Sequence, residues 1–334
     1  MGRAKSSMRK CNIPNCGVDA RAQKHLIAIM LKTLPKLLLS VLAMGFAFGA
    51  AYAQAAPAVV TPKPPAKIEA KPAMWVVKDA DTTIYLFGTV HILKPEISWF
   101  NGAVKSAFDG SDRLVLELVE PPPAVSQKLF EKLGVDHSGR TLRSKMSAGE
   151  KTTYEKAMAG LGFPIAPFDR YDPWAVAVTV DVMALTRNGF DAGSGAEQVL
   201  SAAAARQKKR VEGVESIEFQ LSILDQLPEK TQMRFLIETI EDTQDMKNGM
   251  DQLVSAWAAS DPEKLGILMN EGLSDPLIFN SLLTNRNANW AKWISTQMAK
   301  PGTTFMAVGA GHLSGPTSVQ TLLSAYGLTA TRLQ

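Results

Sequence analysis

Apolar and polar positions along this chain predict strands at both ends of a folded region and helices between them. Two short apolar runs, 74–78 (MWVVK) and 83–87 (TIYLF), flank a polar tetrapeptide and predict a β-hairpin. A third run, 112–118 (DRLVLEL), is almost continuously apolar, which is typical of a buried strand. Later strands are predicted at 210–214 (RVEGV), 304–308 (TFMAV) and 328–333 (LTATRL).

The stretch from Pro121 to about Lys300 is mostly helical in pattern, because its apolar residues recur every three or four positions. We therefore predict an α/β fold: a central mixed β-sheet flanked by helices, with a large helical insertion between the N-terminal strands and a C-terminal β-α-β unit. The predicted helices lie at 99–108, 174–187, 196–206, 217–227, 232–240, 250–258, 277–298 and 318–325.

The first 53 residues carry the pattern of an export signal. They contain eight Lys or Arg and one Asp, then an apolar run of 14 residues and an Ala-Tyr-Ala sequence ending at Ala53. We expect cleavage after Ala53 and a periplasmic or secreted protein, with Met30 as the true start. No cysteine follows the apolar run, and the run is short for a membrane span, so we expect no stable membrane anchor.

Removal of the leader changes the charge of the chain. Residues 54–334 hold 28 basic and 31 acidic side chains, a net charge of −3, so no nucleic-acid partner is expected. Both cysteines, Cys11 and Cys16, are lost with the leader. Residues 54–73 contain five prolines and predict an extended linker. One folded domain is expected at 74–334.

The histidines indicate the chemistry of the chain. His91 and His312 each end a Gly-x-x-His tetrad, and each tetrad directly follows a predicted strand. In open α/β sheets, ligands bind outside the carboxyl ends of the strands. The hypothesis is that both imidazoles converge on one sheet edge, although 221 positions separate them. If they share one ion, their nitrogens should lie within roughly 5 Å of each other.

Two glutamates occupy equivalent positions. Glu117 lies near the end of 112–118, on the opposite side from the leucines of that strand, where an unpaired charge would be costly. Glu215 directly follows 210–214. Two His and two Glu form a nitrogen and oxygen ligand set suited to Mn²⁺, Co²⁺, Fe²⁺ or Zn²⁺. Either glutamate could instead belong to a structural ion pair.

Other catalytic patterns are missing from the sequence. It contains no G-x-S-x-G, P-loop, H-E-x-x-H or G-x-G-x-x-G motif. A serine hydrolase with His312 as base would have to use an unmarked serine, such as Ser314 or Ser194. His137 lies in a polar loop and is expected to be exposed to solvent.

An ordered set of motifs resembles the TraB/GumN family over residues 74–334. That family is related to the Tiki metalloproteases and, more distantly, to the erythromycin-esterase/ChaN-like fold. Ala196 departs from the branched apolar residue expected at its position, which leaves the role of Glu197 open. The motifs are GTVH (88–91), LVLELVEP with Glu117, PWAVAV (173–178), GAE (195–197), VEGVESIEFQL with Glu215 and Gln220, Arg286-Asn287, and VGAGHLSGPTSVQTLLSAYGL (308–328).

The resemblance implies a metal-dependent hydrolase, and specifically a peptidase, that uses Mn²⁺ or Co²⁺. His91 and His312 would bind the metal, and Glu117 would complete the site or act as general base. Arg286 would stabilise the developing oxyanion. Further candidates for the site are Glu215, Glu197 and Asn287.

Two rival functions remain open at this stage. A non-catalytic module that binds a peptide, haem or iron would keep its ligand when Glu117 is changed, whereas a hydrolase would lose turnover. An accessory role in exopolysaccharide production is suggested by the family resemblance alone. The expected partner of the enzyme is a peptide or other small substrate.

Overall fold

The computed structural model describes residues 67–243, 245–270 and 275–334, except the side chain of Asn270. The predicted signal segment, its cleavage point and most of the predicted linker lie outside these residues. Among the described residues, no helix is both long and apolar enough to cross a membrane.

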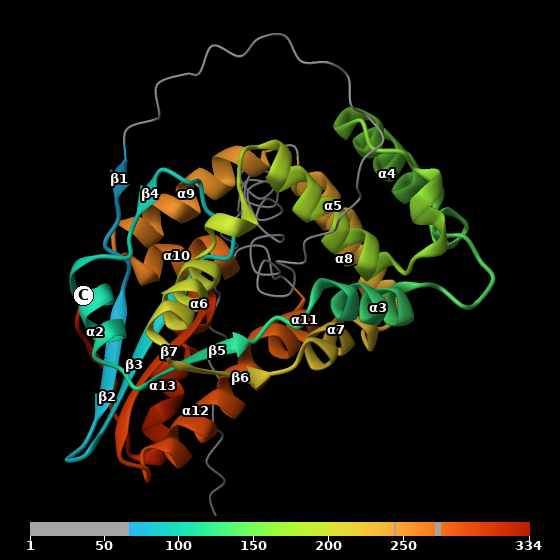
Figure 1. Ribbon diagram of the computed structural model, residues 1–334. Coiled ribbons are helices and arrows are strands. Elements are labelled where there is room, and N and C mark those ends of the chain that lie inside the picture. The colour runs from blue at the N-terminus through green and yellow to red at the C-terminus, as the bar shows by residue number, and fades with distance from the viewer. Residues whose placement is uncertain (1–66, 244, 271–274) are drawn as a thin grey trace, which may run out of the picture.

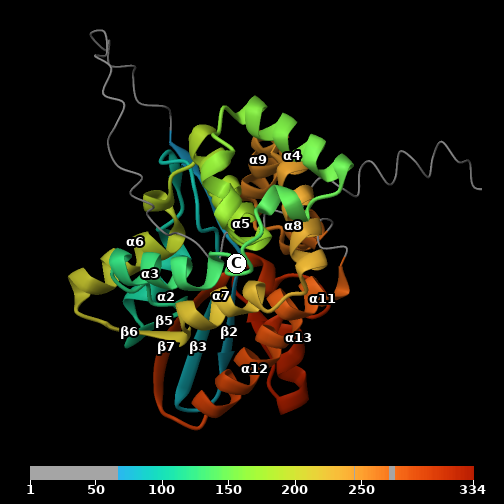
Figure 2. The same ribbon diagram turned by 90° about the vertical axis from the view of Figure 1, so that its right-hand side faces the viewer.

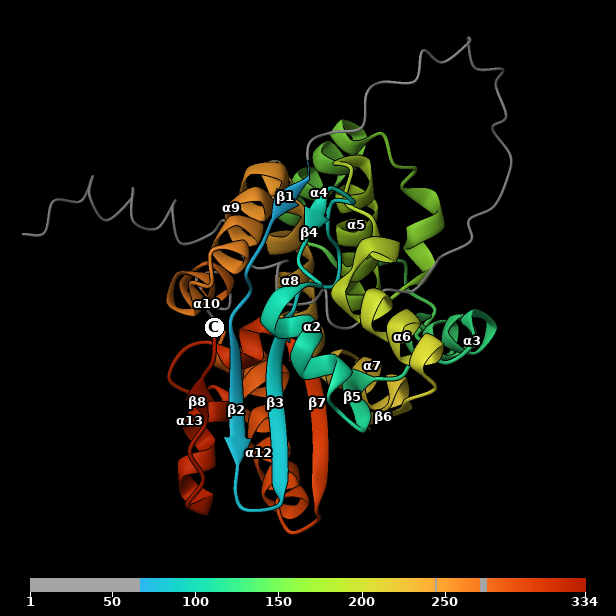
Figure 3. The same ribbon diagram turned by 60° about the vertical axis from the view of Figure 1, so that its left-hand side comes forward.

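The fold is α/β and is built on a six-stranded mixed sheet with the order β6-β5-β7-β3-β2-β8. The central strand β7 pairs in parallel with both β3 and β5, and β5 pairs in parallel with β6. The predicted hairpin forms from β2 and β3, and β8 closes the sheet beyond β2. Figure 3 shows these strands face on. Their bounds are β2 Met74–Lys78, β3 Thr82–Thr89, β5 Arg113–Leu118, β6 Arg210–Glu215, β7 Gly302–Gly309 and β8 Thr331–Arg332.

Alternating side chains give the sheet two apolar faces. Leu114 and Leu116 of β5 belong to the larger core, which contains most of the helical insertion. Val115 points the other way and packs in a second core with Trp290 and Ile294. Glu117, two residues beyond Val115, therefore projects from the second face, as the period of a strand requires.

Helices surround the sheet on both faces and at one end. Several helices of the insertion gather beyond the carboxyl ends of the parallel strands, and α12 lies along the second face (Figures 1 and 2). The helices are α2 Gly102–Asp109, α3 Pro123–Gly134, α4 Ala148–Leu161, α5 Pro173–Arg187, α6 Ala196–Gln207, α7 Ile217–Asp225, α8 Glu229–Asp242, α9 Met246–Ala258, α10 Pro262–Asn270, α11 Pro276–Phe279, α12 Asn285–Gln297 and α13 Val319–Leu322.

Three elements differ from the prediction. The predicted helix 277–298 is divided into α11 and α12 by a π-helical turn, Asn280–Thr284. The helix predicted at 318–325 is only one turn of α-helix followed by a 3₁₀ turn, and the last strand shortens to Thr331–Arg332. Apolar spacing of three and four residues does not mark a π turn, because such a turn is a short i→i+5 interruption inside an otherwise α-helical segment.

The folded region also begins earlier than Met74. The short strand β1, Ile68–Glu69, pairs in parallel with β4, Ile97–Ser98, and Ala70 is buried. The end of the proline-rich segment therefore packs on the domain, because its backbone pairs with residues 97–98. The sequence pattern did not predict a strand at these residues.

Candidate functional site

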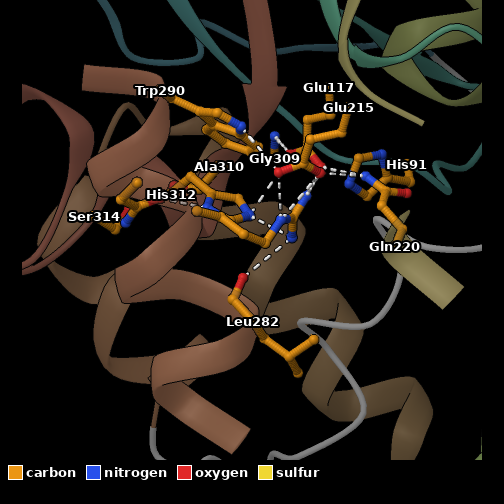
Figure 4. Close-up of polar contacts among 12 residues, drawn as sticks. His91, Glu117, Glu215, Gln220, Leu282, Trp290, Gly309, Ala310, His312 and Ser314 are labelled. Carbon is orange, nitrogen blue, oxygen red and sulfur yellow. Dashed lines mark hydrogen bonds and ion pairs between the residues drawn. The ribbon is translucent and has the colours of Figure 1, made fainter. Parts of the chain in front are cut away.

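His91 and His312 both lie at the carboxyl edge of the sheet. His91 follows the end of β3, and His312 lies in the 3₁₀ turn Ala310–Leu313 that directly follows β7. Gly309, between the two, shows how closely the site is packed. A methyl group on Gly309 would stand 3.0 Å from Glu117 Oε1, 3.2 Å from His91 Nε2 and 3.5 Å from His312 Cδ2. The structure therefore brings both histidines and Glu117 around one point, as Figure 4 illustrates.

Glu117 is buried, and both of its oxygens are held. Oε1 accepts a hydrogen bond of 2.5 Å from the backbone N–H of Gly309 and lies 3.7 Å from His312 Nε2. Oε2 accepts one of 2.7 Å from Arg286 Nη2. Burial raises the pKa of Glu117, although Arg286 and His91 act to lower it. The carboxylate is thus fixed in position and less acidic than usual.

Arg286 enters from α12 and is 2% exposed. Its Nε and Nη2 donate to the Glu215 carboxylate at 2.7 to 3.1 Å, and Nη2 also donates to Glu117. Nη1 donates to the carbonyl of Leu282, 3.1 Å away, and lies 3.2 Å from His312 Nε2. A guanidinium has five N–H bonds, and these acceptors engage all five.

The contacts of His312 fix its tautomer. Arg286 can only donate, so His312 Nε2 accepts, and the ring proton must lie on Nδ1. Nδ1 then donates to Asn287 Oδ1 at 2.5 Å, while the amide nitrogen of Asn287 donates to the carbonyl of Thr317. Burial lowers the pKa of His312 well below its usual value, and Arg286 and His91 add to the effect. His312 is therefore a neutral imidazole at physiological pH.

His91 is held by the start of α6. Its Nδ1 lies 2.6 Å from Glu197 Oε1, and the Ala196 N–H donates to the carbonyl of Val90. Gly195 permits this approach, because a Cβ there would stand 2.0 Å from the carbonyl oxygen of His91. Burial acts to lower the pKa of His91, but Glu197 and Glu117 outweigh it and the net shift is upward. The GAE motif therefore places an acceptor on His91.

Two more side chains complete the network: Gln220, which the sequence analysis named only as part of a family motif, and Trp290, which it did not single out. Gln220, fully buried on α7, donates to Glu215 Oε2 at 2.9 Å and sits 3.5 Å from Glu117 Oε2. Trp290 of α12 donates to Glu215 Oε1 at 3.0 Å, and its ring centre lies 4.4 Å from that of His312. The signal for Trp290 was its position four residues after Arg286, on the same face of a helix.

The sequence of the whole domain matches that of a known protein family. The sequence profile of the TraB/PrgY/gumN family matches residues 73–332. The chain belongs to this family. It is similar to an uncharacterized protein of Treponema pallidum, 25% identical over 266 residues that cover 73% of this chain and 78% of that protein. It is also similar to the uncharacterized protein YbaP of Escherichia coli, 23% identical over 252 residues that cover 75% and 92% of the two chains. No solved structure matches it.

The site of this TraB/PrgY/gumN chain has donors that suit a divalent metal. Both histidines have Nδ1 beside a side-chain oxygen, an arrangement that turns the Nε2 lone pair inward in metal sites. The site holds three carboxylates and one arginine: Glu117 and Glu215 pair with Arg286, and Glu197 pairs with His91, so a negative charge remains even when His91 is protonated. The chemistry of the donors thus fits a cation.

The side chains as they lie do not yet form a closed ligand shell. Within the described part of the chain, no three His, Cys, Asp or Glu side chains are grouped closely enough to hold a metal ion. His312 Nε2 is engaged by Arg286. For His312 to become a ligand, it would have to exchange this hydrogen bond for a metal bond, whereas Nε2 of His91 has no such competitor among the hydrogen bonds of the site.

The rival residues of the sequence analysis lie elsewhere. Ser314 donates its hydroxyl proton to the carbonyl of Ala310, and Ser194 donates to Asp191. Neither hydroxyl is directed to His312, so this arrangement does not favour a serine nucleophile. His137 is exposed, as the polar loop around it indicated.

Proposed function

We propose that this protein is an exported metal-dependent hydrolase that acts on peptides. The observation that carries the proposal is the Glu117 carboxylate fixed beside the Nε2 atoms of two histidines whose Nδ1 atoms face side-chain oxygens. Membership of the TraB/PrgY/gumN family is consistent with it.

His91 and His312 are the residues that would hold the metal, with Mn²⁺ or Co²⁺ favoured and Fe²⁺ or Zn²⁺ as alternatives. Glu117 is the third candidate ligand of the resemblance, and we assign it to proton transfer instead. When bound, a divalent ion in such a site supplies Lewis-acid activation of water and of a carbonyl oxygen. The contribution of Glu197 is to keep His91 Nδ1 occupied, so that Nε2 stays directed toward Glu117.

Glu117 is the group that we assign as proton acceptor. Its pKa is raised by burial, and a carboxylate base works better as its pKa approaches the operating pH. The Gly309 N–H and Arg286 hold the carboxylate in place before and after it accepts a proton at Oε1. Since Arg286 stays paired with Glu215, protonation of Glu117 leaves no unpaired cation behind.

Arg286 is better suited to positioning than to direct contact with an oxyanion. All five of its N–H bonds have partners within the protein, so none is free for a substrate oxygen. We therefore assign Arg286 the task of holding Glu117, Glu215 and His312 in register, which differs from the oxyanion role expected from the resemblance.

The export part of the proposal rests on the pattern of residues 1–53. N-terminal sequencing of the protein recovered from outside the cytoplasm should begin at Gln54 or within a residue or two of it. A mature chain that retains Cys11 would overturn this part without affecting the proposal for the site.

The site is tested by metal binding and turnover in the same preparation. The mature protein, loaded separately with Mn²⁺, Co²⁺, Fe²⁺ and Zn²⁺, should bind about one equivalent of at least one metal and cleave an unfolded polypeptide, reduced and carboxymethylated α-lactalbumin. His91→Ala should lose the metal. Glu212→Gln, a change on β6 remote from the histidines, serves as the matched control and should keep both properties.

Two results would refute the proposal. One is metal content that never exceeds a small fraction of an equivalent after reconstitution. The other is unchanged metal affinity in His91→Ala and in His312→Ala, which would make the two tetrads structural turns. A strong Soret band that persists in Glu117→Gln would support the haem-binding alternative.

A further inference from the structure

A cleft of about 430 Å³ opens beside the candidate site, next to Glu215. Its walls come from the last residues of β6, the start of α7 and one face of α12. This volume lies in the range of pockets that bind ligands. The lining residues are Gly213, Val214, Glu215, Ser216, Phe219, Asn289, Trp290 and Trp293.

One wall of the cleft is the backbone of an edge strand. β6 pairs with β5 on one side, and none of the described residues pairs with it on the other. An open edge presents unpaired N–H and C=O groups, which is the surface that extended polypeptides use to add a strand. Gly213 lies in the exposed part of this strand and carries no side chain that would cover it.

The opposite walls are aromatic. Phe219, in the first turn of α7, is 42% exposed. Trp293 is partly buried and stands on α12, three residues after Trp290. Aromatic walls with exposed rings favour an apolar or aromatic side chain as occupant.

The cleft offers no free charge. Its one ionisable side chain, Glu215, is held by Arg286 Nε and Nη2, by Trp290 Nε1 and by Gln220 Nε2. The hydroxyl of Ser216 caps α7 by accepting from the Phe219 N–H. An ionic ligand therefore finds no counter-charge here, whereas a polypeptide with an apolar side chain finds both backbone and aromatic partners.

The cleft adjoins the candidate site. Trp290 lines the cleft and also packs against His312, with 4.4 Å between the two ring centres, and against the guanidinium of Arg286, whose Cζ lies 4.9 Å from the Trp290 ring centre. Figure 4 shows Trp290, Glu215 and His312 side by side. A single layer of side chains therefore separates an occupant of the cleft from the cluster.

We propose that this cleft is a substrate subsite that binds an extended polypeptide segment, pairing its backbone with the edge of β6 and taking one large apolar side chain between Phe219 and Trp293. The proposal rests on the proposed function, since it names the substrate class of the same hydrolase. It assigns Phe219 and Trp293 as the residues that set substrate preference.

The test measures binding separately from turnover. Fluorescein-labelled, reduced and carboxymethylated α-lactalbumin is titrated with the metal-loaded protein, and affinity is read from fluorescence anisotropy. Phe219→Ala and Trp293→Ala should each weaken binding about tenfold, as expected for loss of an aromatic anchor. Tyr326→Ala removes an equally exposed aromatic ring, 43% exposed, far along the chain, and should leave affinity within about twofold.

A second arm identifies the side chain that the cleft accepts. A blocked heptapeptide of alanine and lysine with a central phenylalanine should compete with the labelled polypeptide, and the same peptide with a central glycine should compete at least about tenfold less well. Equal competition by the two peptides would overturn the assignment of the aromatic pocket.

The outcomes separate this inference from the proposed function. If the wild type binds the polypeptide, the cleft variants lose binding and no metal supports turnover, the subsite stands and the hydrolase proposal fails. If turnover occurs and both cleft variants keep the wild-type affinity and KM, the hydrolase stands and the subsite is wrong. Absence of polypeptide binding by the wild type also overturns the subsite. Because Phe219 is exposed, Phe219→Ala should fold even if Trp293→Ala does not.

Discussion

Lys145 and Arg286 are both buried beside carboxylates, and we propose a chemical role only for the surroundings of Arg286. Lys145 is 2% exposed at its side chain and pairs with Asp136, Asp172 and Glu229, the last two at 3.2 Å. We call these four residues the lysine cluster.

Arg286 is equally buried against Glu117 and Glu215. We call these three residues, together with His91, His312 and Glu197, the arginine cluster.

The two clusters differ in what their carboxylates are ready to do. Burial would raise the pKa of Asp136, but Lys145 and Ser138 outweigh it and lower the pKa to about 2. In the arginine cluster, burial prevails and the pKa of Glu117 is raised. The lysine cluster joins a loop to the starts of α5 and α8 and contains no histidine. A buried ion pair alone thus indicates a structural tie, and the neighbouring imidazoles are the reason why we propose a chemical role for the other cluster.

Substitution of Glu117 is the most direct test of the difference between the two clusters. Glu117→Gln keeps the shape of the side chain and leaves Arg286 paired with Glu215, so the fold should survive. Turnover should fall roughly a thousandfold, within the range for loss of a general base. Single-turnover kinetics at saturating substrate measure the loss, and thermal unfolding checks the fold. Activity within tenfold of the wild type would make Glu117 a structural residue like Asp136.

A substitution in the lysine cluster should change the stability of the protein and leave its activity unchanged. Lys145→Met removes the cation and leaves the buried Asp136 carboxylate without it, which should lower the free energy of unfolding by about 3 kcal/mol. Urea unfolding measures this effect. Activity per folded molecule should be unchanged, and Lys105→Met, which removes an exposed pair with Asp109, should shift stability by less than about 1 kcal/mol. A large loss of kcat in Lys145→Met would contradict the division into two kinds of cluster.

Substitution of Glu197 tests whether the arginine cluster binds a metal through His91. Glu197→Gln removes the charge that faces His91 Nδ1, and changes to such supporting groups typically lower metal affinity by about 10- to 100-fold. Competition with a chelating dye measures the affinity. Gln198→Ala, on the next position of α6, is the control and should bind metal as the wild type does.

Acid should have a smaller effect, a loss of the stability that Asp136 of the lysine cluster contributes. The pKa of Asp136 in the folded protein is about 2, below its ordinary value of 3.8. Its ionised form therefore stabilises the fold fully above about pH 4, and this contribution is lost as the pH falls toward 2. Unfolding free energies measured at several pH values in this window should fall more steeply for the wild type than for Asp136→Asn. Parallel curves would show that Asp136 is not tied to Lys145 in solution.

Local patterns predicted the part of the site that depends on strands. The alternation in 112–118 placed Glu117 on the face opposite Leu114 and Leu116, and the two Gly-x-x-His tetrads marked two strand ends. Both expectations follow from the period of a strand and from the break that glycine makes. They needed no knowledge of which strands are neighbours.

The rest of the site depends on contacts that leave little trace in local sequence. The acceptor for His91 comes from Glu197 at the start of α6, and the donor for Glu117 is the backbone N–H of Gly309. One N–H of Arg286 goes to the carbonyl of Leu282, which lies in the π turn before α12. Tertiary packing decides these details, so periodicity could not supply them.

The central place of β7 determines when this site comes into being. Residues 302–309 pair with β3 on one side and β5 on the other. Until they are in place, β3 and β5 have no common neighbour, and loops of about two hundred residues must close to bring these strands to β7, which is a slow step in folding. The cluster is therefore assembled only when β7 joins the sheet. A chain cut short before residue 302 contains His91, Glu117 and Arg286 and still has no site.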